Sequence, residues 1–229
     1  MKLSMHATVI AGLLLLGVTG CGSTTPAPSP TTSSSATPTP TATASSAPSE
    51  PAEVDVTAAV VVMTASTLSV FGTDGSTLAS VSYEMDGATA VAQIAEALDE
   101  DPVVTPIAEI GGGPCPAATS YAFGGLQLRS PGSLWSSGSY EAIVTGATTS
   151  GGIGIETIAG QRIGATQSGF QAAIGEFMVL YEDPDRLGFD VLNPEAHEWD
   201  RIGAYAEFSG GTLTYLAAPN RLGFVGSCA

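Results

Sequence analysis

Residues 60–83 read VVVMTASTLSVFGTDGSTLASVSY, and together with the fifteen residues that follow they decide the predicted fold class. The stretch is rich in β-branched residues, and the pair Asp74-Gly75 between two such runs is typical of a tight hairpin turn. It therefore predicts antiparallel strands at 60–64, 67–71 and 77–83.

The next residues, 84–98, carry a helical pattern, EMDGATAVAQIAEAL. Asp86 can cap a helix at its N-terminus, and Pro102 ends it. The apolar residues on one face recur at i, i+3, i+4 and i+7, at Val91, Ile94, Ala95 and Leu98. After the helix, 119–129 and 139–146 are predicted as strands around the loop PGSLWSSG.

A similar order of elements recurs in the second part of the chain. IGIETI, the turn Ala159-Gly160 and QRIG predict a short hairpin, and Thr166 can cap a helix that stops at Gly175. Its expected apolar face is Phe170, Ala173, Ile174 and Phe177. Strands are then predicted at 187–192, 203–209 and 212–218. We expect an α+β domain, in which two weak hairpin-helix-strand repeats (54–147 and 148–229) form a sheet with helices on one face.

The N-terminus has the pattern of an export signal. A basic start at Lys2 precedes the uncharged apolar segment ATVIAGLLLLGVTG, which at 14 residues is shorter than the roughly 20 that span a bilayer. Val18-Thr19-Gly20-Cys21 resembles the lipobox of bacterial lipoproteins, with valine in place of the commoner leucine. The resemblance implies cleavage after residue 20 and a diacylglycerol group on Cys21, at the extracytoplasmic face of the cell membrane. The alternative is a free signal peptide with an incidental cysteine.

Residues 22–53 form a stalk, which together with Cys21 makes up the predicted segment 21–53. Half of the stalk residues are Ser or Thr, and none is aromatic or a large aliphatic. Such a composition buries too little apolar surface to offset its ordering entropy, which predicts a disordered tether. Residues 54–229 are long enough for a single domain with a core of its own.

The other two cysteines are Cys115 and Cys228. If Cys21 is acylated, they form an even pair in an oxidising compartment, where a disulfide is expected. A catalytic thiol is the competing interpretation, but it needs positive surroundings, and the sequence from Gly111 to Phe123 has no charged residue.

The charge of the chain excludes several classes of partner and of enzyme. Loss of Lys2 with the signal peptide leaves five arginines against 22 acidic residues, a formal charge of −17. Nucleic acid and anionic lipid surfaces need positive charge, so neither is an expected partner. A chain without lysine cannot form a P-loop or a Ser-x-x-Lys site, and one remaining histidine cannot build a His-based zinc site.

The run IGATQSGFQAAIGEF, residues 163–177, is similar to the helix motif of BLIP-like and SmpA/OmlA-type lipoproteins. Phe177 stands where that family has proline. In the first half the matches are Ile94, Leu98 and a proline one place late at Pro102. The resemblance implies a sheet with helices on one face and a non-enzymatic binding or inhibitory surface on the other.

His197 is the candidate catalytic residue. It lies in NPEAHEWDRIG, and a general base oriented by Asp200 or Glu198 would need a serine nucleophile from elsewhere. The alternative is a loop in which His197 and its acidic neighbours are solvated while Trp199 packs inward. We expect no metal or cofactor, although the acidic stretches 99–102 and 182–190 could hold Ca²⁺ loosely. The latter places Gly188 at the glycine position of an EF-hand but Pro194 where the bidentate glutamate belongs.

A short motif occurs twice, PDRLGF at 184–189 and PNRLGF at 219–224. It is either a turn and strand start used twice or a pair of arginine anchors, Arg186 and Arg221, for a carboxylate or a partner surface. Trp135 and Trp199 are further candidates for contact with a ligand. The expected function is a lipid-anchored surface protein with a non-catalytic domain that binds a protein or a cell-wall partner. The alternatives are an inhibitor or modulator of a secreted enzyme and a hydrolase that uses His197.

Overall fold

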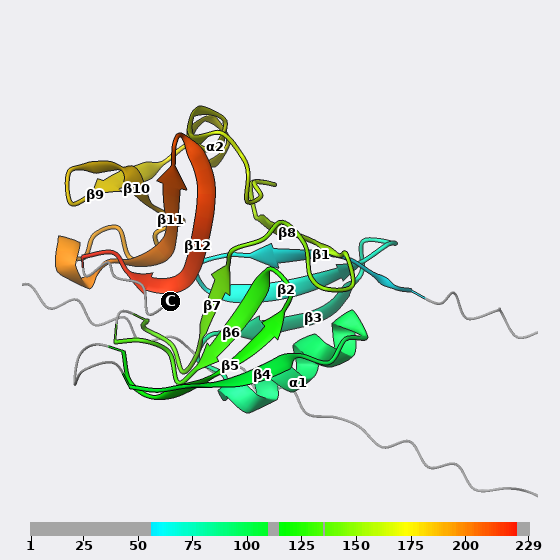
Figure 1. The fold of residues 1–229 in the computed structure, drawn as a ribbon. Coiled ribbons are helices and arrows are strands. Elements are labelled where there is room, and N and C mark those ends of the chain that lie inside the picture. The colour runs from blue at the N-terminus through cyan, green and yellow to red at the C-terminus, as the bar shows by residue number, and fades with distance from the viewer. Residues whose placement is uncertain (1–55, 110–114, 135, 224–229) are drawn as a thin grey trace, which may run out of the picture. The chain divides into compact units, whose positions relative to one another are not determined.

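The structure is a computed structural model, which describes residues 56–109, 115–134 and 136–223 (Figure 1). The described residues belong to one compact unit. The described residues contain twelve strands in two sheets, two α-helices and one short 3-10 helix. None of the helices among them is long and apolar enough to cross a bilayer.

The smaller sheet has four strands in the order β3-β2-β1-β8. Its first three strands are antiparallel, while β8 pairs in parallel with β1. The predicted hairpin turn is confirmed: Gly75 has a φ of 80°, and the Ser76 amide donates to the Asp74 carboxylate over 2.8 Å. The strands are β1 (Ala58–Met63), β2 (Thr67–Gly72), β3 (Thr77–Ser82) and β8 (Gly154–Thr157).

The larger sheet has eight antiparallel strands in the order β4-β5-β6-β7-β12-β11-β10-β9. Its centre is the junction of β7 with β12, which brings residues 142–144 beside residues 216–218. The strands are β4 (Val103–Ile107), β5 (Ala118–Phe123), β6 (Leu126–Ser130), β7 (Glu141–Val144), β9 (Phe177–Leu180), β10 (Asp183–Phe189), β11 (Ile202–Ser209) and β12 (Thr212–Arg221).

Helix α1 (Gly87–Leu98) forms where the sequence predicts it. The Asp86 carboxylate accepts a hydrogen bond from the Thr89 amide over 3.0 Å, which caps the first turn. The buried face includes Val91, Ile94 and Leu98, and the helix contacts β2 and β3 of one sheet and β6 of the other.

Helix α2 (Gln167–Ile174) is also capped as predicted, since the Thr166 hydroxyl accepts from the Gly169 amide over 3.2 Å. It ends before Gly175, whose φ of 73° favours glycine. The expected position of Phe177 on this helix is wrong, because Phe177 begins strand β9. The buried residue of α2 is Phe170, whose ring lies 5.2 Å from that of Phe189.

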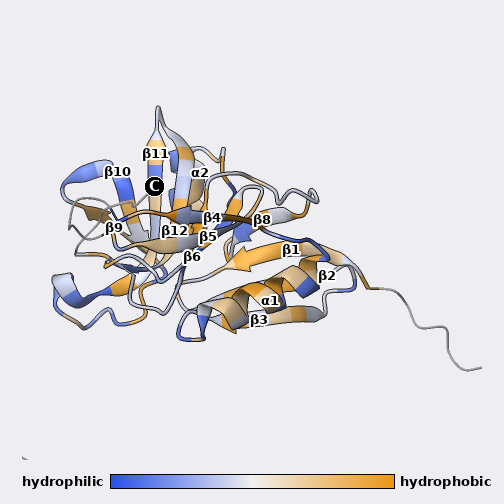
Figure 2. Ribbon diagram, turned by 60° about the horizontal axis from the view of Figure 1, so that its bottom comes forward, coloured by the Kyte–Doolittle hydropathy of each residue, from blue (hydrophilic) through white to orange (hydrophobic). Residues whose placement is uncertain are grey.

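The main core lies between the two sheets and α1, and a second cluster lies on the opposite face of the larger sheet. Alternation along the strands separates them: Ala142 and Val144 belong to the main core, whereas Ile143 belongs to the second cluster. In Figure 2, β1 is largely hydrophobic and β10 largely hydrophilic. The second cluster consists of Ile143, Leu180, Tyr205, Ala217 and Leu222.

The predicted α+β class is wrong, because the described residues are mostly β-sheet with two short helices. Helix α1 sits at the junction of two sheets, and α2 is too short to cover a face. Residues 161–164 form no strand, and 119–129 is a hairpin turned at Gly124, whose φ is 62°. The prediction of two sequential repeats within one sheet is also wrong, since β8 joins β1 to β3 in the smaller sheet while β4 to β7 lie in the larger sheet.

Candidate functional site

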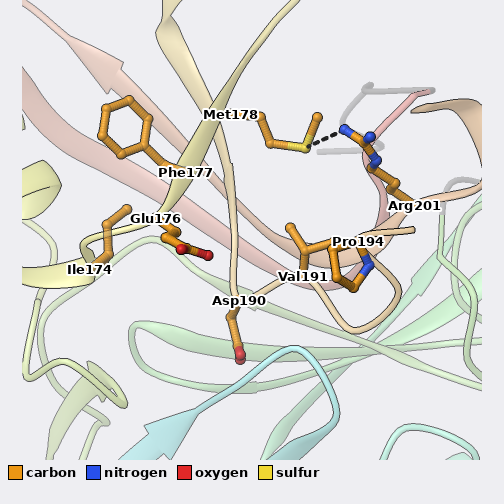
Figure 3. A pocket seen from close by; sticks show the side chains of 8 residues that line it. All are labelled: Ile174, Glu176, Phe177, Met178, Asp190, Val191, Pro194 and Arg201. Carbon is orange, nitrogen blue, oxygen red and sulfur yellow. Dashed lines mark hydrogen bonds between the residues drawn. The ribbon is translucent and has the colours of Figure 1, made fainter. Parts of the chain in front are cut away.

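Two adjoining hollows lie along β9 and the segment that connects β10 to β11. The larger has a volume of about 560 Å³ and the smaller about 290 Å³, and Met178 lines both. We call them together the β9 cleft (Figure 3 shows the larger hollow). The larger is lined by Ile174, Glu176, Phe177, Met178, Asp190, Val191, Pro194 and Arg201; the smaller is lined by Met178, Val179, Leu180, Tyr181, Glu182, Glu198, Trp199, Leu222 and Gly223.

Exposed apolar side chains gather at this cleft. Phe177, Val179 and Tyr181 are 40%, 48% and 51% exposed, and Trp199 is 43% exposed. Because side chains alternate along a strand, Phe177 and Val179 share one face of β9, and Met178 and Leu180 on the other face pack in or against the second cluster. A group of large exposed apolar side chains in a hollow marks an interaction site more often than a scattered surface residue does.

The wall opposite β9 is the segment 190–201, and hydrogen bonds fix it. The Asp190 carboxylate accepts from the Ala65 amide over 2.7 Å, which ties the segment to the loop after β1. Asn193 closes the other end: its amide donates to the Asp200 carbonyl over 2.8 Å, and its Oδ1 accepts from the Ile202 amide over 2.7 Å. The cleft therefore has a wall that is organised without a ligand.

Arg201 reaches across the larger hollow toward β9. Its Nε donates to the Ala196 carbonyl over 3.2 Å, and its Nη1 lies 3.9 Å from the Met178 sulfur (Figure 3). The guanidinium is thus positioned by the wall segment and covers the thioether.

The aromatic side of the smaller hollow depends on a glycine. The Tyr181 hydroxyl donates to the Gly223 carbonyl over 2.7 Å. A Cβ atom added at Gly223 would lie 2.3 Å from the Cα atom of Trp199, so a side chain there cannot fit without a shift of the backbone. Gly223 thereby lets Tyr181 and Trp199 border one hollow.

Negative charge surrounds these apolar groups. Glu176, Glu182 and Glu198 are exposed cleft residues, and no described hydrogen bond or ion pair engages their carboxylates. The stretch 176–201 carries eight carboxylates and two guanidiniums. The cleft can therefore offer apolar contact together with attraction for a cation.

His197 lies on the surface beside the cleft, in the turn before the 3-10 helix η1 (Glu198–Asp200). Its Nδ1 accepts from the Trp199 amide over 3.5 Å. Within the described residues no hydrogen bond or ion pair joins the imidazole to the carboxylate of Asp200 or Glu198, so the structure does not bring these groups together as a base and its orienting acid. Trp199, expected to pack inward in the alternative interpretation, is instead partly exposed at the cleft.

The two arginines of the repeated motif do not lie together. Arg186 on β10 is ion-paired, with its Nε 3.3 Å from Asp183 and its Nη2 4.0 Å from Glu207. Arg221 is exposed at the end of β12. They are in register with Glu207 and Ile202 of β11, positions about 17 Å apart along a strand. Leu187 and Leu222 of the same motifs are buried. The first copy lies within β10, but β12 ends at Arg221, so the second copy does not start a strand.

Acidic residues of the stretches considered for Ca²⁺ make structural contacts within the domain. Glu100 accepts from the Gly151 amide over 3.0 Å, and Asp99 is the left-handed residue that closes α1. Among the described residues, no group of three or more acidic, histidine or cysteine side chains has a geometry fit for a metal ion.

Three further predicted residues, Cys21, Trp135 and Cys228, lie outside the described residues. Cys115 is within them, buried and disulfide-bonded. Its pairing with Cys228 stays a prediction.

A buried charge pair lies elsewhere in the larger sheet. Arg129 on β6 and Glu141 on β7 are cross-strand neighbours, both buried, with Nη1 and Oε2 4.0 Å apart. Arg129 donates to the Pro116 carbonyl over 2.7 Å, and the Glu141 carboxylate accepts from the Ser133 amide over 3.3 Å. Burial raises the pKa of Glu141, an effect that the Ser133 hydrogen bonds and Arg129 oppose.

Trp199 is predicted from the sequence as a contact residue, but Phe177 and Tyr181, which line the same cleft, are not. The signal was present in FMVLY at 177–181, where large apolar residues occupy successive positions directly after a helix stop.

A comparison of the chain with protein-family models, curated proteins and solved structures finds no match.

Proposed function

We propose that this chain is a lipid-anchored extracytoplasmic binding protein whose ligand occupies the β9 cleft. The observation that carries the binding role is the cleft itself: a pre-formed hollow with Phe177, Tyr181 and Trp199 exposed at its border. The groups that line it supply apolar contact and charge, which suits recognition of a partner.

The anchor is supported by the sequence of the N-terminus. An apolar segment too short to span a bilayer ends at Cys21 and continues into a stretch of Ser, Thr and Pro. A diacylglycerol group on Cys21 would hold the protein at the membrane, and the stalk would carry the domain away from it.

The anchor is tested by fractionation of cells that produce Cys21→Ser. We expect the native protein in the membrane fraction and the variant outside it. Retention of Cys21→Ser in the membrane at the native level would contradict lipid anchoring at this residue.

The binding role is tested with the full chain as cells produce it, immobilised and exposed to envelope extract. We expect a retained protein or wall polymer that is lost with Trp199→Ala. Ile158→Ala is the matched control, because Ile158 is also a large exposed side chain but lies in the turn after β8. Equal retention by both variants and the native chain would contradict binding at the cleft.

An inhibitor or modulator of a secreted enzyme is the second candidate. The exposed aromatic side chains favour it, because aromatic residues at the centre of an interface often supply most of its affinity. A retained protein whose hydrolytic activity falls when it binds the chain would favour this role over simple attachment.

A further inference from the structure

We propose that the β9 cleft receives an extended cationic segment of a partner protein, which pairs with the free edge of β9 as an added strand. This inference rests on the proposed binding role and names the class of ligand. Three features carry it: a strand edge that pairs with no other described strand, an apolar row on that strand, and nearby carboxylates that have no hydrogen bond or ion pair within the described part of the chain.

The free edge provides the backbone contacts. β9 is the last strand of the larger sheet, and its pairing within the described residues is with β10 alone. A strand has hydrogen-bonding groups on two edges, so the second edge of β9 can pair with an extended peptide. Lysine and proline often protect such edges, and the strand sequence FMVL contains neither.

The opposite edge of the same sheet provides a contrast. β4 contains Pro106, which has no backbone N–H to donate, and proline on an edge discourages the pairing of a further strand. The two edges of the larger sheet therefore differ in their capacity to accept a strand.

The apolar row provides side-chain contacts. Phe177 and Val179 project from the same face of β9, whereas Tyr181 lies just beyond the end of the strand with a φ of 56°. A strand added alongside would place every second side chain next to this row. Alternating peptides with aliphatic residues at every second position fit this arrangement.

The carboxylates select the charge of the ligand. Glu176 precedes β9, Glu182 follows it, and Glu198 stands across the smaller hollow. Arg186 forms an ion pair with Asp183, while Arg201 keeps its positive charge, since its described contacts are the neutral Ala196 carbonyl and the Met178 sulfur. The eight carboxylates of residues 176–201 still outnumber the two guanidiniums. The field around the edge therefore attracts lysine or arginine side chains.

The same charge argues against a second copy of this chain at the edge. The chain without its signal peptide carries a formal charge of −17, so two copies repel each other, and an anionic polymer is repelled likewise. A cationic partner protein is the occupant that both the backbone and the charge favour.

The test measures binding of three peptides to the full chain by calorimetry. The probe is acetyl-KVKVKVKV-amide. The second peptide replaces each lysine by glutamate, and the third keeps the lysines but carries N-methyl groups on alternate backbone nitrogens. We expect the probe to bind at least about tenfold more tightly than either control, because one lacks the charge and the other blocks the edge hydrogen bonds.

Two variants locate the peptide. Val179→Lys places a cation on the proposed edge, whereas Val103→Lys makes the same change on β4, where Val103 is 66% exposed. We expect Val179→Lys to weaken probe binding by at least about tenfold and Val103→Lys by less than about twofold. Thermal unfolding of both variants checks that each is folded.

Several outcomes would overturn the inference: no binding of the probe, equal binding of the glutamate peptide, or equal binding of the N-methylated peptide. Equal effects of the two lysine substitutions would overturn it as well. If the probe fails while envelope capture still depends on Trp199, the binding role stands and the cationic strand is wrong. If capture is also independent of Trp199, both proposals fail.

Discussion

At the scale of single residues, Glu141 shows how burial disfavours the ionised form of a carboxyl group even next to an arginine. Its carboxyl lies beside Arg129, yet the nearest guanidinium nitrogen is 4.0 Å away. Burial removes the carboxylate from water, and the Ser133 and Arg129 contacts offset this only in part, so its pKa is raised.

This raised pKa predicts a pH dependence of stability. A carboxyl with a raised pKa binds its proton more tightly in the folded than in the unfolded state, so its contribution to stability is lost as pH rises through the folded pKa. We expect the native chain to lose more free energy of unfolding between about pH 4 and about pH 8 than Glu141→Gln does. Urea denaturation at both pH values measures the difference.

The control for this experiment is Glu96→Gln, which makes the same chemical change at an exposed position on α1. It should keep the native pH dependence. A Glu141→Gln chain that loses as much stability as the native one would show that the Glu141 carboxyl does not resist ionisation.

Some single-residue roles were predictable from sequence and others were not. Asp86 and Thr166 cap helices through hydrogen bonds to amides three residues ahead, so a short window contains the whole interaction. Arg129 is fully buried, but its burial depends on Pro116 and on a neighbouring strand. No local pattern distinguishes it from the exposed arginines.

At the scale of elements, α2 depends on one side chain. Phe170 is fully buried and packs edge-on to Phe189 and Phe208, at centroid distances of 5.2 and 5.4 Å. The rest of the helix is exposed or half-buried. An eight-residue helix is marginal in isolation, so this aromatic contact holds α2 on the larger sheet.

We therefore expect Phe170→Ala to destabilise the protein by about 3–5 kcal/mol, as loss of a buried aromatic side chain leaves a cavity. Ile174→Ala, one turn later and half-buried, should cost distinctly less. Equilibrium denaturation compares the two variants. A similar small loss for both would mean that α2 is not attached through Phe170.

The strands that were not predicted from the sequence lack a clear local pattern, for physical reasons. β4 contains Pro106 and lies exposed at an edge, so it shows neither alternation nor a buried apolar run. The hairpin of β5 and β6 turns at two adjacent glycines inside a run that otherwise suits a single strand. β9 follows α2 after two residues, and its apolar residues extend the helical pattern without a break.

At the scale of the whole molecule, the sheet order depends on contacts between distant residues. Val60 pairs with Gly154, and Leu216 pairs with Val144. Local sequence patterns indicate strands and hairpins. They do not indicate whether the strands of the two halves of the chain form one sheet or are divided between two sheets. The pairing of β8 with β1 makes the expected repeat fold wrong, and the junction of β7 with β12 leaves β9 at one edge of the larger sheet.

The predicted bridge between Cys115 and Cys228 is a constraint of the same scale. Cys115 is buried and disulfide-bonded at the start of the segment that leads into β5, and a partner at residue 228 would close a loop of more than 100 residues. On the chain-entropy model, such a loop stabilises the folded state by about 4–5 kcal/mol, and measured values are usually smaller.

We expect the Cys115→Ser/Cys228→Ser double variant to lose about 2–4 kcal/mol of unfolding free energy. The loss should match that of the native chain under reductant, and reductant should leave the double variant unchanged. Denaturation with and without reductant measures all four cases. Native stability that does not respond to full reduction would contradict a stabilising bridge, and peptide mapping that finds Cys228 as a free thiol would contradict the pairing.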